Sequence, residues 1–245
     1  PGQRLTAEAT GGTISPREAV TGADGQATFT FTPAGVGLSE ARFRVEGSNV
    51  AATRAVALGR PVIERIVNAA SFLPGLATGG IATIFGANLA TTEPRDATFP
   101  GVARLAGAEV WINNRPTTVL YADDRQINFV VPRGLAPADY TLEVRTSEGN
   151  SAGTRVFIDV AWPGLFQAAA QGSDRIAVYG TGLGVDPLIA TATVGGQEAA
   201  VQLAGEIPGG ATEVILERPV GLRGAQPVRL RIGQRESNVV VVELP

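Results

Sequence analysis

One pattern in this chain occurs twice, and it constrains the fold more than any other feature. Residues 81–89 read IATIFGANL and residues 176–183 read IAVYGTGL, each an apolar run that ends in an aromatic, a glycine-led turn and a leucine. Downstream, the apolar run at 126–132 is closed by proline, and the run at 213–219 closes in the same way. A repeated unit built from short apolar runs and turn residues predicts stacked all-β modules.

The composition fits an all-β chain and removes several kinds of chemistry. Among the 245 residues, 31 Gly and 16 Pro separate short runs rich in Val, Ile, Thr and Phe, which is typical of sandwiches with many turns. The chain has no Cys, His or Met, and all 20 basic residues are Arg. We therefore expect no disulfide, no thiolate or Lys nucleophile, no His base or ligand, no catalytic residue and no cofactor.

The charge pattern speaks against two classes of partner. The net charge is -3 and both signs are interspersed, without a block of Arg. Nucleic-acid binding therefore has no electrostatic footprint in this sequence. A run of about 18 apolar residues is also absent, so we expect no membrane insertion.

Residues 1–59 are expected to form a first module of about four or five strands. Phe29 and Phe31 alternate with Thr, and Leu5 and Phe43 lie in similar alternating runs, which places these side chains on apolar faces. The dipeptide at Asp24 and Gly25 predicts a β-hairpin. So few strands do not complete an immunoglobulin-type sandwich.

The strings GGTIS at 11–15 and VTGADGQATFTFTP at 20–33 resemble bacterial Ig-like domains of the invasin and intimin type. The resemblance implies that residues 1–3 lie in the middle of the domain, after its first two strands. We expect either that further residues precede this chain or that a partner supplies the missing strands. In the second case Leu5, Phe29, Phe31 and Phe43 would form a strand-exchange interface, because an open sandwich exposes unpaired edges and apolar faces.

Residues 62–161 and 162–245 are predicted to be the second and third modules. They resemble an uncharacterised C-terminal domain family that is abundant in secreted proteins of acidobacteria. The strings that carry this resemblance are IVNAASF at 66–72, TIFG at 83–86, QINFVVP at 126–132 and PGLF at 163–166. Each half also resembles an IPT/TIG-type Ig-like module, through FGANL at 85–89 and YGTGL at 179–183. The resemblance implies an extracellular β-sandwich protein and brings no catalytic residue. The fold expected for the whole chain is all-β, with three tandem Ig-like β-sandwich modules, the first incomplete.

The few aromatic residues include the candidates for binding and for packing between modules. Trp111 lies between Val110 and Ile112, so the alternation places it on the outer face of a strand, where an indole can stack on a sugar ring. Packing at a module junction is the alternative for this residue. Trp162, Pro163 and Phe166 are expected to form the junction between the second and third modules.

Two other patterns suggest chemistry but favour a structural interpretation. The glycines of residues 180–184 resemble a dinucleotide-binding loop, but Pro187 follows where such a loop needs a helix. Asp123, Asp124 and Asp186 offer carboxylate oxygens to Ca²⁺, but without the spacing of an EF-hand. We interpret them as turn residues and predict no metal site, although calcium between modules stays open.

These observations favour a non-enzymatic secreted or cell-surface protein with a structural role. It would act as a stalk, an adhesin or a filament subunit, through self-association or contact with other surface proteins. Strand donation into the incomplete first module is one hypothesis for such assembly. The alternative is a carbohydrate-binding module of a secreted polysaccharide-active protein, with a polysaccharide as its partner.

Overall fold

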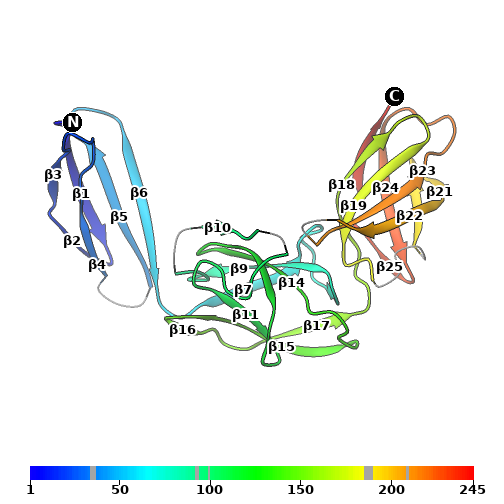
Figure 1. Cartoon of the computed structure of the whole chain (residues 1–245), viewed down its shortest axis with the longest axis horizontal. Helices are drawn as coiled ribbons and strands as arrows, with labels where there is room; N and C mark the ends of the chain where they lie inside the picture. Colours follow the sequence, from blue (N-terminus) through cyan, green and yellow to red (C-terminus); the bar gives the residue numbers. More distant parts are fainter. Residues whose placement is uncertain (34–36, 92–93, 99, 185–189, 208–209) are drawn as a thin grey trace.

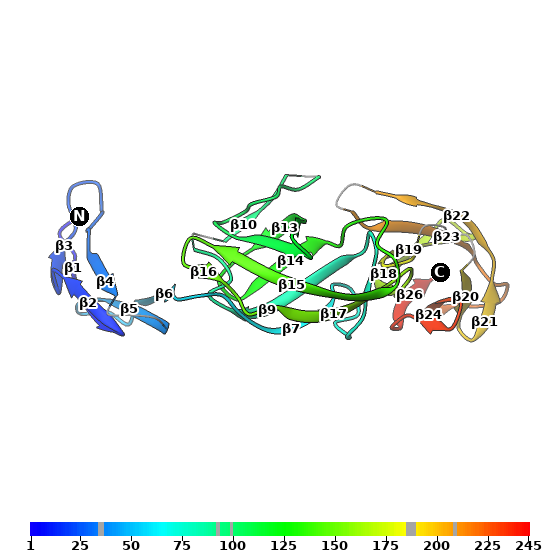
Figure 2. The same ribbon diagram turned by 90° about the horizontal axis from the view of Figure 1, so that it is seen from below.

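The protein is all-β, and its strands form three successive Ig-like modules (Figure 1). The structure, a computed structural model, describes residues 1–33, 37–91, 94–98, 100–184, 190–207 and 210–245. Within these ranges the chain contains no helix, and hence none that could cross a membrane. Figure 2 shows the three modules in a row, in the order of the sequence. The predicted fold class is therefore confirmed.

The first module pairs a four-stranded sheet with a two-stranded one. The four-stranded sheet has the order β3-β1-β5-β6, and the small sheet is the antiparallel pair β2-β4. The strands are β1 (Arg4–Thr10), β2 (Gly12–Ser15), β3 (Glu18–Val20), β4 (Thr30–Pro33), β5 (Gly37–Val45) and β6 (Ala51–Leu58).

The predicted hairpin at Asp24 and Gly25 is wrong, although the turn itself forms. Gly25 has φ +79°, and the Asp24 carboxylate accepts a hydrogen bond from the Gln26 N–H at 3.0 Å. The strands before and after this turn, β3 and β4, lie in different sheets and do not pair. Turn residues dictate only that the chain reverses, whereas packing decides which strands then pair.

The middle module is a larger sandwich of two sheets, with the orders β10-β13-β14-β9-β7 and β12-β11-β15-β17-β8. A short strand, β16, also pairs with β15. The strands are β7 (Val62–Asn68), β8 (Leu76–Ala77), β9 (Ile81–Ala87), β10 (Arg95–Asp96), β11 (Glu109–Ile112), β12 (Arg115–Pro116), β13 (Thr118–Ala122), β14 (Gln126–Val130), β15 (Ala138–Thr146), β16 (Gly149–Asn150) and β17 (Thr154–Asp159).

The third module repeats this plan with sheets β18-β19-β23-β22 and β21-β20-β24-β25, and β26 also pairs with β24. The strands are β18 (Gly164–Gln171), β19 (Arg175–Thr181), β20 (Thr191–Val194), β21 (Gln197–Ala199), β22 (Val201–Glu206), β23 (Thr212–Glu217), β24 (Gly224–Ile232), β25 (Arg235–Glu236) and β26 (Val240–Leu244). The strand groups fall within residues 1–59, 62–161 and 162–245; that these limits are domain boundaries stays a prediction.

The sequence repeat corresponds to a repeat of topology. Both repeated runs form a central strand, since β9 lies between β7 and β14 just as β19 lies between β18 and β23. A buried serine lies at the equivalent place beside the second sheet of the middle and third modules, Ser151 in the former and Ser237 in the latter. Ser151 Oγ accepts the Val144 N–H at 3.0 Å and donates to the Ala152 carbonyl at 3.0 Å. Ser237 Oγ accepts the Leu230 N–H at 3.0 Å and donates to the carbonyl of the next residue at 2.7 Å.

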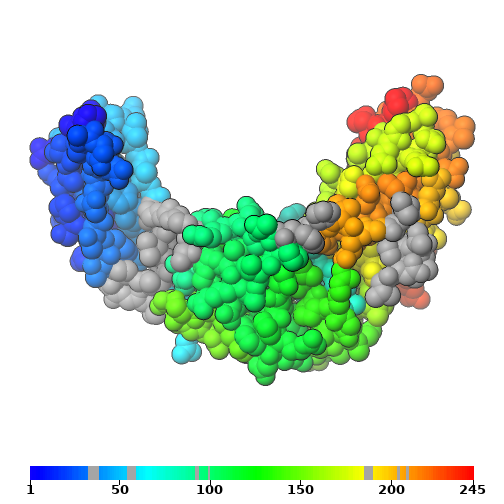
Figure 3. All heavy atoms as spheres, viewed as in Figure 1, coloured from blue at the N-terminus to red at the C-terminus, as the bar shows by residue number. Residues whose placement is uncertain are grey.

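Each of the two larger modules encloses its own apolar core. Ile84, Ile127 and Phe129 are fully buried in the middle module, and Ile176 and Leu230 are fully buried in the third. The pattern along β24 alternates strictly, with every second side chain buried from Val228 onwards, as a strand between core and solvent requires. Figure 3 shows the first and third modules standing apart on either side of the middle module.

Candidate functional site

The first module has an incompletely covered core. Only Ala7, Ile14 and Ala41 are buried in its core cluster among the described residues. Phe29, Phe31 and Phe43 pack against them but are only partly buried. The Phe29 and Phe43 rings meet at 5.3 Å with a tilt of 58°. A two-stranded sheet is therefore too narrow to close this core.

The edges of the small sheet are open in the part of the chain that the structure describes. Beyond the β2–β4 pair no described strand joins this sheet. Residues 27–29 precede β4 without main-chain pairing among the described residues, although the alternation of Phe29 and Phe31 predicts one continuous strand. Gly12 leaves room for the Phe31 ring of the neighbouring strand, because a Cβ there would lie 2.6 Å from that ring. The predicted strand-exchange residues Leu5, Phe29, Phe31 and Phe43 are all half-buried.

The joint between the middle and third modules is centred on Asn68, the last residue of β7. This side chain is 2 % exposed and donates from Nδ2 to the Trp162 carbonyl at 2.9 Å. Its Oδ1 accepts the N–H groups of Ala70 and Ser71 at 2.9 and 3.1 Å. One amide thus fixes both the loop after β7 and the linker to the third module. This role of Asn68 was not predicted from the sequence.

Trp162 fills the same joint. Its indole packs against Gly75, where a Cβ would collide with the ring. On the ring lies the Arg235 guanidinium, 3.7 Å from the centroid, which also pairs with Asp159 at 3.2 Å. The Thr181 hydroxyl accepts the Ile81 N–H across the joint at 2.6 Å. Side chains and main chain of both modules therefore fix this joint together.

The other predicted junction residues lie beside Trp162. Pro163 is buried. Phe166 is 42 % exposed, next to a bulge in β18, so its contribution to the junction stays a prediction.

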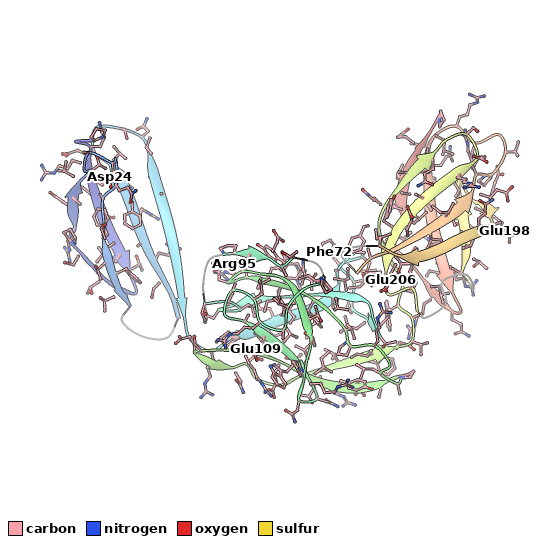
Figure 4. The ribbon with its side chains drawn as sticks, viewed as in Figure 1. Asp24, Phe72, Arg95, Glu109, Glu198 and Glu206 are labelled. Carbon is pink, nitrogen blue, oxygen red and sulfur yellow. The ribbon has the colours of Figure 1, made fainter. Side chains whose placement is uncertain are left out.

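The glycines at 180–184 lie at the joint between the middle and third modules. Gly182 has φ +66°, and its carbonyl accepts a hydrogen bond from the Trp162 N–H at 2.7 Å. Gly182 also leaves no room for a Cβ beside the Trp162 carbonyl. Its neighbours line a hollow of about 340 Å³ between the modules, across which Arg133 and Glu206 form an ion pair. Figure 4 shows Glu206 on the side of the third module that faces the middle one.

Trp111 lies on the outer face of β11, as its alternation with the buried Val110 and Ile112 predicts. Its Nε1–H donates to Glu109 at 2.9 Å, and the Arg145 guanidinium lies 4.1 Å from the ring centroid. Arg145 in turn pairs with Glu143 at 3.2 Å. One side of the indole is thus occupied by a paired cation.

A hollow of about 450 Å³ adjoins Trp111, lined also by Asn113, Asn114, Thr141 and Glu143. Arg145 is opposite Glu109 in the register, whereas Asn113 meets Thr141 at the other end of the ladder. The Arg145 guanidinium also donates to Asn114 Oδ1 at 3.2 Å, so it borders this hollow. Asn113 and Asn114 have φ +44° and +61°, as the two-residue turn between β11 and β12 requires.

The acidic residues considered for calcium act in a turn. Asp123 accepts the N–H groups of Arg125 and Gln126 at 2.7 and 2.5 Å. It also accepts the Tyr121 hydroxyl at 2.7 Å, and this bond raises the pKa of Tyr121 to about 12. Asp124 pairs with Arg125 at 3.5 Å. Asp186 lies outside the described residues. Within the described ranges, no three acidic side chains come together as a candidate metal site.

No protein-family model matches the chain, and no curated protein matches its sequence. Solved structures do resemble it. SGBP-B from a mixed-linkage glucan utilization locus of Bacteroides ovatus, solved with a mixed-linkage heptasaccharide, is 17 % identical over 98 % of this chain and 60 % of that one, with a TM-score of 0.38.

Two further similar structures are a binding protein and an enzyme. Invasin, a bacterial integrin-binding protein, is 13 % identical over 100 % of this chain and 53 % of its own, with a TM-score of 0.26. A gamma-CGTase from alkalophilic Bacillus clarkii is 12 % identical over 98 % of this chain and 35 % of its own, with a TM-score of 0.30. The chain thus spans less than two thirds of each of these three proteins.

Proposed function

We propose that this chain is a non-enzymatic structural part of a secreted or cell-surface protein, and that its first module is completed by a strand from another polypeptide. The observation that carries the proposal is the narrow sheet β2-β4 over the half-buried Phe29, Phe31 and Phe43. The neighbouring modules and their fixed joint would hold this module beside a rigid pair.

A strand added beside β4 would satisfy two needs at once. It would pair with the main chain of residues 27–29 and of β4, and it would cover the phenylalanine rings. Burying a large apolar side chain completely contributes about 1.5–3 kcal/mol, so half-buried rings leave part of this free energy for the incoming strand. If another copy of the chain donates the strand, contacts run head to tail and a filament grows.

The proposal is tested on the 1–245 chain by light scattering over a concentration series, with negative-stain microscopy. We expect open-ended oligomers in the wild type. Thr28→Pro should abolish them, because it removes an exposed N–H that no described group accepts. The matched control, Thr28→Ala, should assemble as the wild type does. A wild-type chain that stays monomeric at every concentration contradicts strand donation between copies.

Carbohydrate binding is the second candidate function, and the hollow beside Trp111 favours it. The Oδ1 atoms of Asn113 and Asn114 already accept hydrogen bonds from the Thr141 N–H and from Arg145, so the indole and the two Nδ2 groups offer an apolar ring and hydrogen-bond donors together. Affinity gel electrophoresis in neutral polysaccharides would test it. Trp111→Ala should remove retardation of the chain, and Trp111→Phe should retain part of it. Equal mobility of wild type and Trp111→Ala in every gel contradicts this function.

A further inference from the structure

An aromatic ring is held out into solvent on the loop that follows β7. Phe72 is 56 % exposed and has φ +56°, a backbone conformation that bulky residues rarely adopt. Strained residues of this kind persist where the surroundings hold them, and they cluster at binding sites. Figure 4 places Phe72 at the end of the middle module nearest the third, away from Glu109 and hence from the Trp111 face.

The loop holds the ring by hydrogen bonds. The Phe72 N–H donates to the Asn68 carbonyl at 3.0 Å, and the Asn68 N–H donates to the Leu73 carbonyl at 3.0 Å. The Leu73 N–H donates to Ser71 Oγ at 3.3 Å. Because the Asn68 amide is itself fixed in the module joint, the ring is pre-organised and a ligand need not order it.

Phe72 is one end of a row of three groups. Its ring centroid lies 6.3 Å from that of Phe85, at a tilt of 35°. On the Phe85 ring lies the Arg65 guanidinium, 4.2 Å from the centroid. Arg65 is exposed, and no carboxylate in the described part of the chain forms an ion pair with it. An apolar ring and an available guanidinium are thus presented together.

Polar groups of β14 continue this face. Gln126 is opposite Phe85 in the register, and Asn128 is opposite Thr83. Asn128 Oδ1 accepts hydrogen bonds from Thr83 Oγ1 and Gln126 Nε2, both at 2.9 Å. These bonds orient the two amides and leave Gln126 Oε1 and Asn128 Nδ2 without a partner among the described residues. One acceptor and one donor of fixed orientation suit the hydroxyls of a sugar.

We propose that this face binds an acidic polysaccharide, a chain that contains hexuronate sugars. One sugar stacks its C–H face on Phe72, while the carboxylate of a neighbouring sugar pairs with Arg65. The amides of Gln126 and Asn128 bind hydroxyls between them. The 35° tilt between the rings suits a single twisted chain in solution better than a flat crystalline surface. This site goes beyond strand addition to the first module and does not depend on it.

The test compares polygalacturonate with its methyl ester, which keeps the sugar chain and lacks the charge. Binding to the full 1–245 chain is measured by affinity electrophoresis and by calorimetry. We expect the wild type to bind polygalacturonate, with affinity that falls as salt rises, and to bind the ester about tenfold more weakly. Arg65→Gln should lose about tenfold for polygalacturonate and bind both polymers alike.

Phe72→Asn separates binding from folding. Asn tolerates positive φ, so this variant relieves the backbone strain and should unfold no earlier than the wild type while losing polygalacturonate affinity about tenfold. Leu73→Ala, at a neighbouring side chain that is also 56 % exposed, is the control and should bind normally. The proposal is overturned if the wild type does not bind polygalacturonate or binds the methyl ester equally well. It is also overturned if Arg65→Gln or Phe72→Asn binds polygalacturonate with wild-type affinity. Equal competition by polyglutamate would overturn it as well, because the site would then bind an acidic peptide.

Discussion

The first and third modules follow the same alternating β pattern but differ in how completely they bury it. In the third module two broad sheets enclose Ile176, Leu216 and Leu230, which are fully buried. Among the described strands of the first module, a four-stranded sheet faces only the pair β2-β4, and Phe43 stays half-exposed. An alternating sequence therefore creates an apolar face, but the width of the opposing sheet decides whether that face becomes a core.

The two ends of the middle module differ in a similar way. Toward the third module, Asn68, Trp162 and Thr181 fix the joint. Toward the first module, the described residues include a long hydrogen bond of 3.4 Å, from Asn88 Nδ2 to the carbonyl of the linker residue Arg60. The middle and third modules should accordingly behave as one unit, with the first module more independent.

The largest effect should come from a core truncation in the third module. Leu230→Ala removes a fully buried side chain and should lower the free energy of unfolding by about 2–5 kcal/mol. Phe43→Ala in the first module should cost less, because the ring is already half-exposed. Urea unfolding followed by far-UV circular dichroism measures both. The two Trp residues lie outside the first module, so a Phe43→Ala variant that shifts Trp fluorescence would contradict its independence.

The joint should be nearly as sensitive at Asn68. Asn68→Ala leaves the Trp162 carbonyl and two loop N–H groups without their partner, at a cost of about 1–3 kcal/mol. The fluorescence of Trp162 should report earlier unfolding in urea. Asn150→Ala, at an exposed asparagine, is the control and should stay within about 0.5 kcal/mol. Equal unfolding curves for the two variants would mean that Asn68 does not stabilise the joint.

A larger residue at Gly75 should loosen the joint between the middle and third modules. Gly75→Ala drives a methyl group into the Trp162 indole at a residue with φ +123°, and overpacking of this kind costs about 1–3 kcal/mol. We expect faster proteolysis of the linker near Trp162. Gly205→Ala meets nothing within 4 Å and should be cut at the wild-type rate. Protection of the linker in both variants would mean that the Trp162 contact does not hold the modules together.

The smallest effect concerns Tyr121, whose pKa of about 12 in the folded chain exceeds the ordinary value of about 10. The raised pKa means that the neutral phenol stabilises the fold below pH about 10, and that this contribution is lost between pH about 10 and about 12. The wild type should therefore lose slightly more stability across this range than Tyr121→Phe. Urea unfolding at both ends of the range measures the difference, and parallel losses would contradict it.

The repeated modules were largely readable from the sequence, because each strand carries its own apolar period. The runs at 81–89 and 176–183 do form equivalent central strands, β9 and β19. The hairpin at Asp24 and Gly25 failed, since a turn is a local property whereas strand partners are chosen by packing. Asn68 escaped prediction because its partner lies 94 positions away. The positive φ of Phe72 has no signature in its residue type.

The Asn68 amide also sets how the chain carries tension. Asn68 ends the first strand of the middle module, and Trp162 begins the connection to the third. A pull entering at β7 can therefore reach the third module through Asn68 and through the bond between Ile81 and Thr181, without passing from strand to strand across the sandwich. The bonds from Asn68 and to Thr181 must break together before the joint extends. The first module does not take part in these contacts, so it should extend first under tension. It would then be the compliant element in series with the stiffer pair formed by the middle and third modules.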